Sequence, residues 1–224
     1  MAMHKNRLLF AKEGRACYIS HLDLMATFQR AFLRAGIEIW QTQGFNRHSY
    51  VSIALPLSVG YTSVCEILEF NLESDMPYDE VVCRMNQALP EGVRVLDCYE
   101  AEIPLKKITW LDWTVTLEYD NGVPQGVAEA FHDLLDREHY VIQKKSKKAK
   151  RGYTEVDIIP MVQTWSLEAE AGKVVLRAQL LAQNPGLNPS ILLDTVTTAH
   201  TEIRPDFVRY HRNEVYGETG AVFR

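Results

Sequence analysis

Three polar residues that could do chemistry, Ser20, His21 and Asp23, stand together in this chain of 224 residues. Apolar residues follow them at spacings of three and four, which predicts an amphipathic helix that begins here and ends at Gly36. The Ser-x-x-Asp spacing is typical of a capping box, which by itself accounts for Ser20 and Asp23. His21 is not needed for capping. The helix dipole disfavours the protonated imidazole, so we expect a neutral ring that could act as a base, a ligand or a hydrogen-bond donor. In the plainer alternative, His21 is simply hydrogen-bonded to a neighbouring loop.

A second polar segment combines a glycine, an aromatic ring and two amides, and its residues are Gln43, Gly44, Phe45, Asn46, Arg47 and His48. Two interpretations stay open. In one, Phe45 stacks on a base or another ring while Gln43 and Asn46 bind its polar edges. In the other, Gly44 makes a tight turn, Asn46 bonds its own backbone and Phe45 packs in the core.

His21 and His48 are the only catalytic candidates, and both are weak. The chain has no close histidine pair and no Glu-x-x-His spacing, so we expect neither a metal site nor a cofactor. Ser20, His21 and Asp23 are not expected to form a catalytic triad, because neighbours within one helical turn point in different directions.

Basic residues concentrate in one short segment that contains Lys144, Lys145, Lys147, Lys148, Lys150 and Arg151. Without these six, the chain has 18 basic against 29 acidic residues. Such a segment could contact phosphates as point charges, with Tyr153 nearby to stack, or it could be a solvated hairpin tip. Arg15, in a turn near the N-terminus, is a further candidate for binding.

The composition is that of a globular protein, with 46% hydrophobic and 24% charged residues. No apolar run approaches the roughly 20 residues of a membrane span, and no signal peptide is evident. The four cysteines, Cys17, Cys65, Cys83 and Cys98, have neither zinc-site nor iron–sulfur spacing, and we interpret Cys65 and Cys83 as small core residues. These features predict a cytoplasmic protein without a membrane partner.

The pattern of elements predicts an α+β fold of two tandem ferredoxin-like halves. In the first half (1–103) we expect the order β-α-β-β-α-β, with an inward helix face that includes Leu22, Met25 and Phe28. Its strands are expected at 7–11, 37–40, 64–72 and 93–99, and its helices at 20–36 and 77–89.

The second half (108–224) repeats that order and carries the basic segment. Its clearest strand is 111–119, where apolar and polar residues alternate strictly. The other strands are expected at 139–143, 156–168, 173–182 and 202–211, and the helices at 124–137 and 188–199.

Three motifs in the first 72 residues, at 19–25, 42–48 and 52–60, resemble the radical SAM-linked protein family. Members of this bacterial family are attached to, or encoded beside, a radical S-adenosylmethionine enzyme of the cobalamin-binding type. The resemblance therefore implies such an enzyme as a partner. This chain lacks the closely spaced cysteines of a radical enzyme, so it is not one itself.

We therefore expect an accessory or substrate-recognition protein that binds RNA or an RNA-containing particle. Two alternatives are a metal-independent RNA-processing enzyme that uses His21 as acid or base, and a pure protein-interaction domain.

Overall fold

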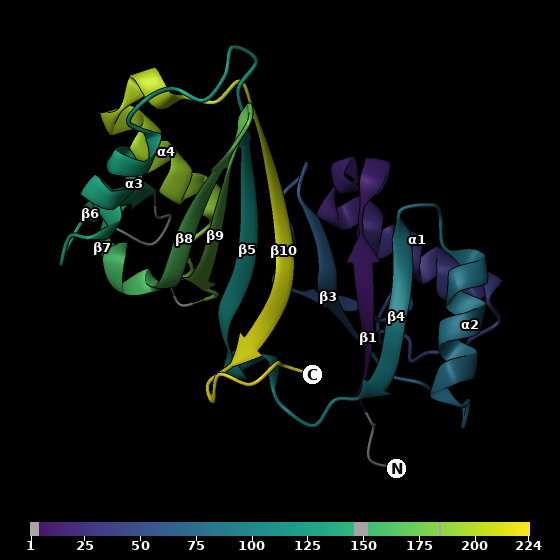
Figure 1. Cartoon of the computed structure of the whole chain (residues 1–224). Coiled ribbons are helices and arrows are strands. Elements are labelled where there is room, and N and C mark those ends of the chain that lie inside the picture. The colour runs from purple at the N-terminus through teal and green to yellow at the C-terminus, as the bar shows by residue number, and fades with distance from the viewer. Residues whose placement is uncertain (1–4, 146–151, 184) are drawn as a thin grey trace. The chain divides into compact units, whose positions relative to one another are not determined.

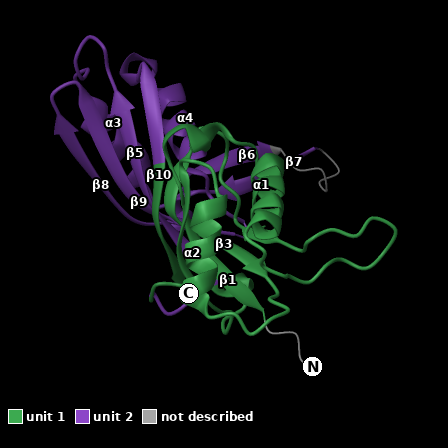
Figure 2. Ribbon diagram, turned by 90° about the vertical axis from the view of Figure 1, so that its right-hand side faces the viewer, with its two compact units in different colours: residues 1–107, 211–217, 221–224 green, residues 108–210, 218–220 purple. Residues whose placement is uncertain are grey.

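The computed structural model describes residues 5–145, 152–183 and 185–224 (Figure 1). It confirms the α+β class, and most of its strand pairs are antiparallel. The chain forms two compact units (Figure 2). Unit 1 comprises residues 1–107, 211–217 and 221–224, and unit 2 comprises residues 108–210 and 218–220.

Unit 1 has the predicted β-α-β-β-α-β order. Its β1 pairs antiparallel with both β3 and β4, and β2 pairs antiparallel with β3, so the strand order is β4-β1-β3-β2. β3 and β4 are therefore parallel with β1 between them, which is the split arrangement of a ferredoxin-like fold. The elements are β1 (Asn6–Lys12), the 3-10 helix η1 (Gly14–Tyr18), α1 (His21–Arg34), β2 (Ser52–Ala54), β3 (Thr62–Phe70), α2 (Tyr78–Ala88), β4 (Val93–Glu100) and the 3-10 helix η2 (Leu105–Lys107).

Two local predictions for unit 1 are wrong. Residues 37–40 do not form a strand, because Ile39 makes only an isolated bridge to Leu72, and the second strand is β2 instead. Leu22 does not face inward but is 76% exposed. The buried stripe of α1 is Leu24, Phe28, Ala31 and Phe32, and Leu22 lies too far around the helix to join it.

The core of unit 1 lies between α1, α2 and the sheet. The ring of Phe28 meets Phe10 edge-on at 4.8 Å, and Phe32 packs against Phe70 at 5.0 Å. On α2 the buried residues are Val81 and Met85. This packing fixes the C-terminal half of α1, from which the segment towards β2 leaves.

Unit 2 also has a ferredoxin-like strand order. β5 pairs antiparallel with β9, β9 pairs with β8, and the first part of β10 lies beside β5. The elements are β5 (Ile108–Glu118), α3 (Val127–Leu135), β6 (Val141–Lys145), β7 (Tyr153–Asp157), η3 (Ile159–Met161), β8 (Val162–Glu170), β9 (Lys173–Leu181), α4 (Pro189–Ala199), η4 (Thr201–Ile203) and β10 (Phe207–Gly217).

The strands predicted for unit 2 are wrong where β6 and β7 form an additional hairpin. The single strand expected at 156–168 is divided into β7, η3 and β8, and β7 pairs with β6 in a separate two-stranded sheet. The last strand begins at Phe207 and not at 202, because residues 201–203 form η4. The alternation on β5 is confirmed, with Leu111, Trp113, Val115 and Leu117 all buried.

Two buried ion pairs belong to unit 1. Arg7 donates to Glu69 at 2.8 Å, and Arg212, in the last part of β10, donates to Glu66 at 2.8 Å. In that part β10 pairs with the start of β3 in parallel. The Arg212 side chain also donates to the Leu55 carbonyl oxygen, and Leu55 has an unusual φ of 46°. The C-terminal residues are thus built into the first unit of the chain.

Candidate functional site

The segment between α1 and β2 carries most of the residues that the sequence marks for binding. We call residues 40–50 the arm. Its two legs pair: Thr42 N–H donates to the His48 carbonyl oxygen at 2.9 Å, and Tyr50 N–H donates to that of Trp40 at 2.9 Å. In Figure 2 the segment between α1 and β2 extends away from the rest of unit 1 as a long loop.

The base of the arm is fixed to the fold by two hydrogen bonds and is braced by a ring contact between its two legs. Trp40 N–H donates to the Asn71 carbonyl oxygen at 2.9 Å, at the end of β3. The Gln29 side chain, on α1, donates to the Ser49 carbonyl oxygen at 3.0 Å. The rings of Trp40 and Tyr50 pack edge to face at 5.6 Å. The arm is therefore a supported projection, held from both the helix and the sheet.

Phe45 stands at the tip of the arm with its side chain fully in water, at 104% exposure. The alternative in which Phe45 packs in the core is therefore wrong. The adjacent Gly44 has a φ of 131°, which only glycine adopts readily, and it turns the chain at this point. A fully exposed aromatic ring can stack on a ligand.

His48 has a structural place in the arm. Its Nδ1 atom lies 3.1 Å from Thr42 Oγ1 and 3.2 Å from the Asn46 carbonyl oxygen, and its N–H also donates to Thr42 Oγ1. These bonds tie the tip to the opposite leg. They account for His48 without a catalytic role.

A small polar pocket of about 240 Å³ opens at the base of the arm. Among the described residues, the side chains of Gln43, Arg47 and Glu73 in this pocket have no hydrogen-bond or ion-pair partner. Arg47 and Glu73 were not among the predicted site residues. The pocket is lined by Trp40, Gln41, Thr42, Gln43, Arg47 and Glu73.

Ser20 caps the start of α1 as predicted, but the Asp23 carboxylate bonds the Ser20 hydroxyl and not the Ser20 backbone N–H that a full capping box would use. Asp23 N–H donates to Ser20 Oγ at 3.2 Å, and Ser20 Oγ donates to the Asp23 carboxylate at 2.7 Å. His21 is the first residue of the helix, and its buried Nδ1 atom finds no hydrogen-bond partner in the described part of the chain. The bonded-loop interpretation of that nitrogen is therefore not supported.

His21 and His48 are not brought together. The arm contacts α1 through Gln29, which lies roughly 12 Å along the helix from His21. Neither histidine lines either of the pockets described here. The geometry gives no basis for a site that uses both.

The other candidate residues lie elsewhere. Arg15 is exposed in η1 of unit 1. In unit 2, Lys144 donates from Nζ to the Gly186 carbonyl oxygen at 3.0 Å, and Lys145 ends β6. Lys147, Lys148, Lys150 and Arg151 lie outside the described residues. Tyr153, the first residue of β7, is 52% exposed.

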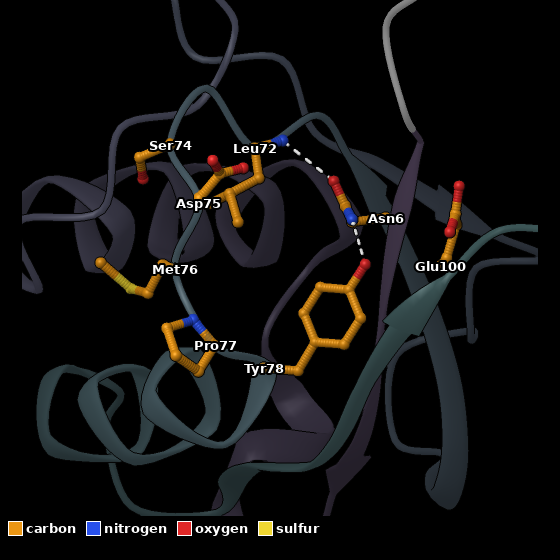
Figure 3. A pocket seen from close by; sticks show the side chains of 8 residues that line it. All are labelled: Asn6, Leu72, Ser74, Asp75, Met76, Pro77, Tyr78 and Glu100. Carbon is orange, nitrogen blue, oxygen red and sulfur yellow. Dashed lines mark hydrogen bonds between the residues drawn. The ribbon is translucent and has the colours of Figure 1, made fainter.

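A second pocket, of about 440 Å³, lies between β1 and the start of α2 (Figure 3). The Asn6 side chain donates to the Tyr78 hydroxyl at 3.0 Å and accepts from Leu72 N–H at 3.0 Å. Burial raises the pKa of Tyr78. The charged groups of this pocket are Asp75 and Glu100, so phosphate would be repelled here. Sequence reasoning did not find this pocket.

Cysteine and metal chemistry offer little in the described part of the chain. Those residues contain no group of three or more His, Cys, Asp or Glu side chains that could hold a metal ion. Cys65 is buried as predicted, but Cys83 is exposed. Cys83 lies on α2, two residues from both Val81 and Met85, which are buried, and this spacing places Cys83 on the opposite face of the helix.

No helix in the ranges that the structure describes has the length and apolarity needed to cross a membrane.

Comparison with known families shows which family the chain belongs to. Residues 5–191 match the family described as uncharacterized protein conserved in bacteria (DUF2344). The chain belongs to this family. A comparison with curated proteins gives no match.

One solved structure shares the fold at low sequence identity, and two others are less similar. A chain of a Cbf5-Nop10-Gar1 complex is 10% identical with a TM-score of 0.53, over 94% of this chain and 48% of that chain. A chain of the archaeal box H/ACA sRNP Nop10-Cbf5 complex is 10% identical with a TM-score of 0.45, over 92% and 46%. An unknown protein from Galdieria sulphuraria is 10% identical with a TM-score of 0.27, over 94% and 97%. This chain thus spans about half the length of the first two.

Proposed function

We propose that this protein is a recognition protein that binds single-stranded RNA through the arm and acts as an accessory to a radical S-adenosylmethionine enzyme. The observation that carries the proposal is the fully exposed ring of Phe45 at the tip of a supported arm. A buried or half-buried ring would have a packing role. An exposed ring has no packing role in the protein, and stacking on a base would remove the ring from water.

The polar groups around Phe45 suit the same ligand. Asn46 and Gln43 are exposed amides that can bind base edges, and Arg47 is a cation without a protein partner among the described residues. Single-stranded RNA offers stacking faces, base edges and phosphates to these groups together. Sequence-specific recognition of RNA usually targets such unpaired bases.

The basic segment of unit 2 adds a second, sequence-independent contribution. Its six Lys and Arg residues suit phosphate contacts, which strengthen binding without reading sequence. Their contribution should decline as salt concentration rises. The arm would then select the ligand, and the basic segment would raise its affinity.

The fold relatives are compatible with an RNA partner. One chain of similar fold comes from a Cbf5-Nop10-Gar1 complex, and a second chain of lower similarity comes from an archaeal box H/ACA sRNP Nop10-Cbf5 complex. Those assemblies are properties of those proteins, and for this chain they only indicate the ligand class to test. The radical enzyme enters the proposal from the sequence resemblance, and co-purification at endogenous levels tests it.

Phe45→Ala tests the proposal directly. Fluorescence anisotropy with a labelled 12-nucleotide RNA of mixed sequence should show binding about 5- to 150-fold weaker than wild type, since one stacked base contributes roughly 1–3 kcal/mol. Thermal unfolding should be unchanged, because the ring is fully exposed and buries no surface against the described residues.

Phe207→Ala is the matched control, because Phe207 is also an exposed phenylalanine but lies on β10 in unit 2. It should bind RNA as wild type does. Equal losses in the two variants, or no loss in Phe45→Ala, would contradict the proposal. Absence of RNA binding at low salt would leave a protein-interaction domain as the function to test.

A further inference from the structure

The pocket at the base of the arm has the chemistry of a base-reading site. We propose that it takes a guanine base of single-stranded RNA, an inference that rests on the proposed function and names its ligand. Two side chains carry it, Glu73 as acceptor and Arg47 as donor, in a polar pocket that Trp40 also lines.

Guanine presents complementary groups to these side chains. Its N1–H and N2 amino group are adjacent donors, and the two oxygens of one carboxylate can accept both. Its O6 and N7 atoms are adjacent acceptors that the arginine fork binds in pairs. Glu73 and Arg47, whose side chains have no partner among the described residues, would both be satisfied by this one base.

The other bases satisfy the pair less well. Adenine, cytosine and uracil each place an acceptor beside their Watson–Crick donor, and that acceptor would face a carboxylate oxygen. A phosphate at this position would be repelled by Glu73, so the pocket is suited to a base and not to the backbone.

The backbone that carries these groups is fixed. Trp40 is bonded to Asn71 and packed against Tyr50, and Glu73 N–H donates to the Glu38 carbonyl oxygen at 3.0 Å. Binding therefore orders only side chains, which lowers its entropic cost. The volume of about 240 Å³ is below the range of drug-sized ligand sites and suits a single base. Phe45, farther along the arm, would stack on a neighbouring base.

A set of labelled uridine 12-mers tests the inference, each with one central guanosine, inosine, adenosine or cytidine. Inosine is guanosine without the N2 amino group. We expect the guanosine strand to bind most tightly and the inosine strand about tenfold more weakly, because one Glu73 oxygen loses its donor. In Glu73→Gln the difference between guanosine and inosine should fall to about twofold or less.

Asp75→Asn is the matched control. Asp75 lies two residues farther along the same acidic turn but lines the other pocket, so this variant should keep the tenfold preference. Equal binding of all four strands, with Phe45→Ala still weakening them, would overturn the guanine inference and leave the proposed function standing. A preference for cytidine, or a preference that survives Glu73→Gln, would also overturn it. No binding of any strand would overturn both.

Discussion

The buried pair of Arg212 and Glu66 makes a strong prediction about stability. Replacing Arg212 by methionine keeps much of the side-chain volume but removes the guanidinium that donates to Glu66 at 2.8 Å and to the Leu55 carbonyl oxygen at 3.0 Å. The side chains of Arg212 and Glu66 are only 5% and 1% exposed. The variant therefore leaves a carboxylate in the core without its main cation.

The expected loss is large. Breaking a buried pair by removing one partner costs about 3–5 kcal/mol, which is a large share of the roughly 5–15 kcal/mol that holds a domain folded. Arg209, three residues earlier on the same strand, pairs with Glu118 in water, with side chains 66% and 35% exposed. Arg209→Met should therefore cost at most about 1 kcal/mol.

The loss should depend on pH with a defined sign. Burial raises the pKa of Glu66, whereas Arg212 opposes that rise. Without Arg212 the pKa in the folded state is higher still, and the folded state then binds more protons than the unfolded state. Stability consequently declines as pH rises from the unfolded pKa of about 4.3 towards the folded one. The deficit of Arg212→Met should be larger at pH 7 than at pH 4.5.

Urea unfolding followed by circular dichroism measures these differences. The double variant Glu66→Leu with Arg212→Met should recover roughly 1–3 kcal/mol of the loss, because it no longer buries an unpaired charge. Equal stabilities for Arg212→Met and Arg209→Met, or a deficit that grows in acid, would refute the reasoning.

Two further predictions concern backbone strain and thiol chemistry. Gly92 has a φ of 84°, and a Cβ atom there would lie 2.6 Å from the Glu13 carbonyl oxygen, whereas at Gly122, with a φ of 86°, it would meet nothing. Gly92→Ala should therefore lower the free energy of unfolding by about 1–3 kcal/mol more than Gly122→Ala does, and similar losses would contradict the predicted clash. Native protein should react with a thiol reagent first at the exposed Cys83. Cys65 and Cys98 should react only on unfolding, since burial raises the pKa of each to about 12, and fast labelling of either would show that its surroundings are open.

Local signals predicted the elements well. The capping residue Ser20 fixes the start of α1, and Asn188 likewise caps α4 by accepting from Ser190 N–H. The alternation of apolar and polar residues identified β5, because successive side chains of a strand point to opposite faces and only one face of this strand is buried. Each of these signals lies within a few neighbouring residues, so one sequence displays it.

The candidate site could be predicted only in part. The polar composition of 43–48 marked the arm, but whether Phe45 is buried depends on pairing between the two legs. Arg47 and Glu73 are distant in sequence, and both line the pocket at the base of the arm, where Trp40 bonds to the end of β3. The sequence did not indicate that Arg212 is buried, because an arginine in an amphipathic strand is normally exposed. Such tertiary contacts leave no local pattern.

The central claim is that this protein binds RNA, and a salt titration of that binding tests it most directly. Anisotropy of a labelled single-stranded 12-mer should give measurable affinity at 50 mM salt, and the logarithm of the association constant should fall with the logarithm of the salt concentration. If four to six residues of the basic segment contact phosphates, the slope should be about −3 to −4. Absence of binding at 50 mM salt, or an affinity that salt does not change, would contradict the account.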